Sequence, residues 1–69
     1  MLYYVYQSRY LYGGAFPGSW VPIGAYERIE DVKTLLVLKK AIINKFETRY
    51  ETSPDEMGCF DMYRIEVQL

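Results

Sequence analysis

Apolar and polar side chains alternate along the carboxyl-terminal segment, from Cys59 to Leu69. The apolar members of the alternation are Tyr63, Ile65, Val67 and Leu69, and the polar members are Arg64, Glu66 and Gln68. Successive side chains of a strand point to opposite sides of the sheet, so a period of two is typical of a strand with one buried face. The pattern predicts a half-buried strand over this segment.

The amino-terminal part of the chain predicts two further strands. Leu2 to Tyr12 is rich in Tyr, Val and Leu and contains no Gly or Pro, a composition that favours a strand. Glycines and a proline between 13 and 18 mark a connection, and Trp20 to Tyr26 predicts the second strand. Pro22 lacks the N–H that a central strand donates, so we expect this strand at an edge of the sheet.

Between Ile29 and Tyr50 the apolar positions recur at steps of three and four, the spacing of one helix face. These positions are Val32, Leu35, Leu36, Ile42, Ile43, Phe46 and Tyr50. Acidic residues near the start and basic residues near the end complement the helix dipole. The sequence therefore predicts one long helix, with its charged side chains in solvent, that ends before the turn residues 53–58.

Together these elements predict an α+β fold in a single domain, residues 1–69, with the order strand, strand, helix, strand. If the helix runs back across a hairpin of the first two strands, the last strand pairs beside the first. The expected product is a three-stranded antiparallel sheet of order 2-1-3 with one helix packed on one face. This order leaves the strand that contains Pro22 at an edge.

A single helix covers only one face of such a sheet, so the other face meets water or a partner. Unbroken alternation along the second strand would turn Val21, Ile23 and Ala25 toward the helix and Trp20, Pro22, Gly24 and Tyr26 away from it. The first strand has two possible registers, with Tyr3 and Val5 toward the helix and Tyr4 and Tyr6 opposite, or the reverse. Either register leaves tyrosine on the uncovered face.

The residues expected on the uncovered face are Tyr4, Tyr6, Trp20, Tyr26 and Met62, joined by Arg64, Glu66 and Gln68. An aromatic patch with a charged rim is typical of an interaction surface. A structural alternative stays open, because cross-strand aromatic pairs stabilise exposed antiparallel sheets by roughly 0.2 to 1 kcal/mol each.

Composition favours binding over catalysis. The 69 residues include eight tyrosines, one cysteine and no histidine, which is the usual proton shuttle and the commonest metal ligand. Cys59 has no histidine to activate it, and the spacing of Asp55, Glu56 and Asp61 is not that of an EF-hand loop. Gly13 and Gly14 have no lysine behind them to complete a phosphate-binding motif. We expect neither enzymatic activity nor a cofactor or metal.

Size and charge narrow the class of partner. A chain of this length buries only roughly 60% of its unfolded surface, and small domains often add a disulfide, a metal or a partner subunit. With one cysteine and no histidine, the chain offers neither an internal disulfide nor a metal cluster. We therefore expect it to associate, either in a homodimer or higher oligomer or with another protein. The net charge of −1 gives no basic field for nucleic acid, and the apolar runs are too short to span a membrane. The expected location is cytoplasmic.

The resulting hypothesis is a non-enzymatic protein-binding domain that acts by steric occlusion, in the style of a small phage or mobile-element inhibitor of a host or defence protein. The expected protein-binding residues are Tyr4, Tyr6, Phe16, Trp20, Tyr26, Met62 and Arg64. Phe16 belongs to an unusually apolar loop and either folds back onto the core or contacts the partner.

Two alternatives remain. One is a homo-oligomer that binds a nucleotide-like ligand between its aromatic faces, with Arg9 or Arg64 at the phosphate. The other is a purely structural homodimer that buries the same face against itself.

Overall fold

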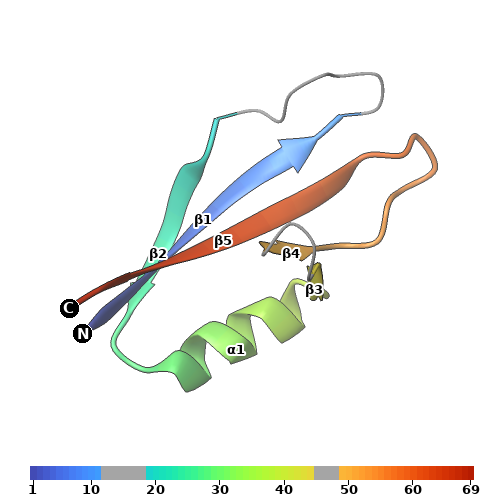
Figure 1. The fold of residues 1–69 in the computed structure, drawn as a ribbon. Helices are drawn as coiled ribbons and strands as arrows, with labels where there is room; N and C mark the ends of the chain where they lie inside the picture. The colour runs from blue at the N-terminus through green and yellow to red at the C-terminus, as the bar shows by residue number, and fades with distance from the viewer. Residues whose placement is uncertain (12–18, 45–48) are drawn as a thin grey trace.

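The computed structural model describes residues 1–11, 19–44 and 49–69, so Phe16 lies outside the described residues. The elements are β1 (Leu2–Tyr10), β2 (Val21–Tyr26), α1 (Ile29–Leu38), β3 (Ile42–Asn44), β4 (Arg49–Glu51) and β5 (Phe60–Gln68). The strands form one antiparallel sheet of order β2-β1-β5-β4-β3, and α1 lies across one of its faces (Figure 1). The α+β class and the 2-1-3 order of the three expected strands are confirmed. The count of three strands is wrong, because the sheet has five.

The central pair of strands is the longest contact in the sheet. β1 and β5 are antiparallel and in register from Leu2 opposite Gln68 to Tyr10 opposite Phe60. The pairing brings the two ends of the chain side by side (Figure 1). Directly opposite residues of an antiparallel pair share a face, so this register determines which side chains of both strands lie beneath the helix.

The core lies between α1 and the centre of that ladder. Val5, Val32, Leu36 and Tyr63 form a buried cluster, in which Tyr63 is only 1% exposed. Burial raises the pKa of the Tyr63 hydroxyl, which keeps the side chain neutral. Since Val5 faces the helix, the first of the two registers is confirmed: Tyr3 packs on the core and Tyr4 and Tyr6 lie on the opposite face.

The prediction of one helix from Ile29 to Tyr50 is wrong, because α1 ends at Leu38. The N–H of Ala41 donates to the Leu36 carbonyl and the N–H of Lys40 to the Val37 carbonyl, both at 3.0 Å. These two bonds, with Lys40 at a φ of 58°, form a Schellman motif. Lys40 occupies the left-handed position that usually holds glycine. The sequence therefore has no glycine at the end of the helix, and the apolar spacing continues past it without a visible break.

The residues beyond this turn form a hairpin instead of helix. Ile42 lies opposite Glu51 and Ile43 opposite Tyr50, and β4 continues the sheet beyond β5, with Tyr50 opposite Tyr63. β-branched residues fit a pleated strand as well as a helix face, which explains why their spacing was ambiguous. Tyr50 still packs on the core, as its apolar spacing predicted, but from the sheet.

The prediction that Tyr26 lies on the uncovered face is also wrong. The pairing of β1 with β2 shifts by one residue between Val5 and Tyr6, so Ile23 is the extra residue of a β-bulge. The bulge interrupts the alternation, so Pro22 stays on the uncovered face opposite Tyr6, while Tyr26 packs on the core. Gly24 provides room for this packing, because a Cβ there would lie 2.7 Å from Cε2 of Tyr26.

The described residues include no helix that is both long and apolar enough to cross a bilayer. α1 has ten residues, about half of the roughly 20 that a membrane span requires.

Replacing Lys40 with glycine is expected to stabilise the fold. Glycine adopts the left-handed conformation without the Cβ clash, which costs other residues roughly 1 kcal/mol or more. Lys40→Gly should therefore raise the free energy of unfolding by about 1 kcal/mol in urea titrations. Lys39→Gly is the matched control: Lys39 is right-handed, with φ −82°, so glycine there should lower stability by about 0.5 to 1 kcal/mol. Equal losses in both variants would contradict the assigned helix end.

Candidate protein-binding surface

The face of the sheet opposite α1 carries most of the aromatic side chains that the sequence placed there. In the β1 and β5 register, Tyr4 lies opposite Glu66 and Tyr6 opposite Arg64. Both pairs alternate with the pair of Val5 and Ile65 beneath the helix, so they lie on the uncovered side. Hereafter "aromatic face" means the surface formed by Tyr4, Tyr6, Tyr10, Trp20, Phe60 and Arg64.

Arg64 is the centre of the aromatic face. Its guanidinium carbon lies 5.2 Å from the ring centroid of Tyr6 and 5.0 Å from that of Trp20. Both separations fall within the range of cation–π contacts. A single cation therefore joins a tyrosine of β1 to the tryptophan that precedes β2, across the width of three strands.

The polar contacts of Arg64 are incomplete. One terminal nitrogen, Nη2, lies 3.0 Å from a carboxylate oxygen of Glu66, two residues along the same strand. Nε is buried and has no hydrogen-bond partner within the described part of the chain. An unsatisfied buried donor costs about 1 to 3 kcal/mol. The guanidinium thus combines two ring contacts with one unsatisfied donor.

A second aromatic contact lies farther along the same face, and the sequence analysis missed it. Tyr10 and Phe60 lie opposite each other at the end of the ladder, with ring centroids 5.0 Å apart and planes inclined by 20°. Such stacked pairs contribute roughly 0.5 to 1.5 kcal/mol beyond the burial of their area. The signal was the alternation of Tyr4, Tyr6 and Tyr10 along β1, which becomes informative only once the register with β5 is known.

Met62 is on the expected side but not at the surface. It lies opposite Ser8 on β1 and Glu51 on β4, and its exposed fraction is 0%. The expectation that it contributes to an exposed patch is therefore wrong, because its position on a central strand places neighbouring strands on both sides. Of the seven expected binding residues, the structure brings Tyr4, Tyr6, Trp20 and Arg64 together at this surface.

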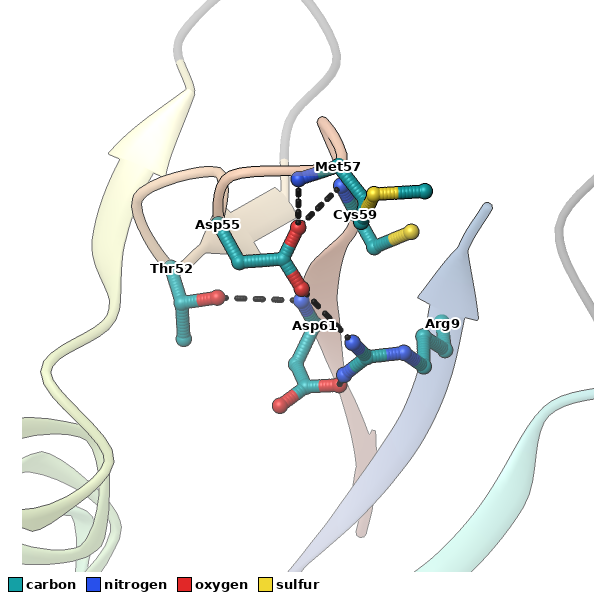
Figure 2. A network of polar contacts seen from close by, with 6 residues as sticks. All are labelled: Arg9, Thr52, Asp55, Met57, Cys59 and Asp61. Atoms are coloured by element: carbon teal, nitrogen blue, oxygen red, sulfur yellow. Dashed lines mark hydrogen bonds and ion pairs between the residues drawn. The ribbon is translucent and has the colours of Figure 1, made fainter. Parts of the chain in front are cut away.

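A separate polar network closes the turn between β4 and β5 (Figure 2). Arg9 forms ion pairs with Asp61 at 3.0 Å and with Asp55 at 3.2 Å. The other carboxylate oxygen of Asp55 accepts hydrogen bonds from the backbone N–H groups of Met57 and Cys59. The turn ends at Gly58, whose φ of 80° suits glycine.

These contacts explain the electrostatics of the turn. The pKa of Asp55 lies below its ordinary value. The largest cause is the hydrogen bond from the N–H of Cys59, and the N–H of Met57 and the charge of Arg9 lower the pKa further. Asp55 and Asp61 thus act with Arg9 in holding the turn. Arg9 lies on the helix side of the sheet in the β1 and β5 register and Arg64 on the other side, so the two arginines do not face one ligand.

Three further features of the described residues concern metal ligands, the free thiol and a surface hollow. No three acidic or cysteine side chains among residues 1–11, 19–44 and 49–69 gather as metal ligands. Cys59 is a half-buried free thiol. A shallow, open hollow of about 390 Å³ lies near Gln7, Arg9 and Val21 at the β1 and β2 edge, and its cation is already paired with two carboxylates.

Comparison with known proteins gives no relative: no family model, no curated protein and no solved structure matches this chain.

The stacking of Arg64 on Trp20 should be measurable as a coupling energy. Cation–π contacts contribute about 0.5 to 1 kcal/mol at exposed sites. In a double-mutant cycle of Trp20→Ala and Arg64→Met, the free energies of unfolding should be non-additive by about this amount. A Trp20→Ala and Lys33→Met cycle is the control, because Lys33 is exposed on the helix, on the other side of the sheet. Additive losses in both cycles would exclude a contribution of the stacking to stability.

Stability should fall in acid because of Asp55. Its pKa is lower in the folded chain, so its stabilising effect is complete above the unfolded pKa of about 3.9 and is lost as the pH falls through the folded pKa. Asn can keep the backbone contacts but carries no charge for Arg9. Urea titrations of wild type and Asp55→Asn should therefore differ most near neutral pH and converge in acid. A difference that stays constant with pH would show that the carboxylate charge has no role.

Proposed function

We propose that this protein is a non-enzymatic protein-binding domain whose contact surface is the aromatic face. The observation that carries the proposal is the stacking of Arg64 between Tyr6 and Trp20 on the side of the sheet away from α1. Trp, Tyr and Arg are the residue types that most often dominate the energetics of protein interfaces. Here Arg64 contacts both Tyr6 and Trp20 in the free protein.

Preorganisation supports this role. A free arginine side chain loses rotamer entropy when it is fixed in an interface, a cost of about 0.5 to 1.5 kcal/mol per immobilised side chain. The two rings already restrict Arg64, whose side chain is nevertheless 42% exposed. The rings of Tyr6 and Trp20 are half-buried rather than covered. The surface can therefore contact a partner without first ordering its central residues.

The charges near this surface favour a protein over a polyanion. Arg64 is paired with Glu66, and Arg49 on β4 is paired with Glu51, which lies opposite Met62. Each cation thus has a carboxylate beside it, whereas a phosphate-binding surface would hold unpaired arginine and lysine. This balance also makes the nucleotide-binding alternative the weaker one, because Glu66 already occupies the exposed end of Arg64.

Binding at this surface would act by occlusion. A rigid sheet surface can cover a site on its partner or hold the partner in one conformation, in the manner of a small inhibitor of a host or defence protein. The aromatic face extends from Tyr4 to the stacked Tyr10 and Phe60 along the ladder, which gives a contact longer than a single hot spot.

Trp20→Ala should abolish most partner binding. We expect the dissociation constant to increase by at least about thirtyfold, equivalent to a hot spot of about 2 kcal/mol. Immobilised wild-type protein would first isolate the partner from a lysate, and calorimetry with the purified partner would then compare the variants. Lys33→Ala, on the exposed side of α1, is the matched control and should bind like wild type. Equal affinity of a folded Trp20→Ala variant would refute the proposal.

A further inference from the structure

The two edges of the sheet differ in how they are protected. Natural edge strands avoid unwanted pairing through proline, bulges, charge or short length. β2 carries both Pro22 and the bulge at Ile23. The opposite edge, β3, has the sequence Ile42–Asn44, with no proline and no charged residue. Among the residues that the structure describes at this edge, the short length of β3 is what limits pairing.

Exposed aliphatic side chains occur on both faces of the sheet near this edge. Ile42 is 73% exposed, and at the end of the adjoining helix Val37 is 75% and Leu38 74% exposed. The Schellman turn brings the end of α1 directly beside β3 (Figure 1). Ile42 lies on the face away from α1, in line with Glu51 and Met62, whereas Val37 and Leu38 belong to the helix on the other face. A partner at this edge would therefore meet exposed apolar side chains on both faces of the sheet, which is typical of a protein contact.

We propose that β3 pairs with β3 of a second copy of this chain, forming a dimer with a continuous ten-stranded sheet. The two strands run antiparallel about a two-fold axis perpendicular to the sheet. In the register that places Ile43 opposite its own copy, Ile42 lies opposite Asn44. Val37 and Leu38 of each copy contribute the remaining apolar contact.

Three properties of the chain favour a second copy as the occupant. An antiparallel edge is self-complementary, since a two-fold axis supplies each main-chain donor with the matching acceptor. The net charge of −1 sets up almost no repulsion between copies. The third property is a small core, with only five apolar residues buried among those that the structure describes, so association would add burial that the monomer lacks.

The surface area that a stable dimer must bury determines which residues belong to the interface. Stable interfaces remove about 800 Å² per partner from solvent, which a three-residue strand cannot supply alone. Val37 and Leu38 are therefore part of the proposed contact and not incidental to it.

The dimer has a consequence for the aromatic face. An axis perpendicular to the sheet keeps equivalent faces on the same side, so both helices lie on one side and both aromatic faces on the other. β3 lies three strands from β1, so the aromatic faces of the two copies would flank the axis. The pairing does not depend on the proposed protein partner, although the dimer would present two copies of that surface.

The solution mass tests the proposal directly. Light scattering from micromolar to millimolar concentration should show wild type approaching twice the 8.2 kDa of one chain. Ile42→Lys and Leu38→Lys should shift the dimer toward monomer by at least tenfold in dissociation constant, about 1.4 kcal/mol. Leu69→Lys, the same change at a residue 95% exposed outside the contact, should leave the dimer intact. A wild-type monomer at every concentration would overturn the proposal, as would a dimer that resists both substitutions.

Cysteine cross-linking tests the pairing itself, without destabilising substitutions. In a Cys59→Ser background, Ile43→Cys places the two Cα atoms about 4.5 to 5.5 Å apart, within reach of a disulfide. Under mild oxidation it should form linked dimers at least about tenfold faster than Leu69→Cys, because pairing raises the effective concentration. Faster linkage of Ile42→Cys would also support the pairing and would centre the register on Ile42. If neither variant is faster than Leu69→Cys, β3 does not pair with itself.

Discussion

The antiparallel ladder between β1 and β5 is the constraint on which both the core and the aromatic face depend. Val5 opposite Ile65 and Tyr6 opposite Arg64 are neighbouring steps of one register. Because the period of a strand is two, a slip by one residue would exchange the two faces and bring Tyr6 beneath α1. Burial of Val5 against the helix therefore also positions Arg64 between Tyr6 and Trp20.

Local patterns in the sequence predicted the parts of the fold that local physics controls. Alternation from Cys59 to Leu69 identified β5, and the missing N–H of Pro22 identified an edge strand and with it the order of the three strands first expected. The apolar spacing of Val32 and Leu36 identified the buried side of α1. The same patterns placed Tyr4, Tyr6, Trp20 and Arg64 on one face.

The errors arose where tertiary contacts override local preference. Lys40 takes a left-handed conformation that disfavours lysine, and the packing of Ala41 on the core accompanies that turn. Ile42 and Ile43 fit a helix or a strand, so only the pairing with β4 decides between them. The bulge at Ile23 is likewise a property of two strands, which is why unbroken alternation misplaced Tyr26.

The early end of the helix has a consequence for the burial of β5. A full-length helix to Tyr50 would have left β5 as an edge, with Met62 and Tyr63 open on one side. Ending the helix early allows β4 to cover that side, and both residues become buried. The unprotected edge then moves outward to β3, where Ile42 is exposed. Burying Met62 and Tyr63 thus creates the edge that we propose for a second copy, separate from the aromatic face that we propose for a different protein.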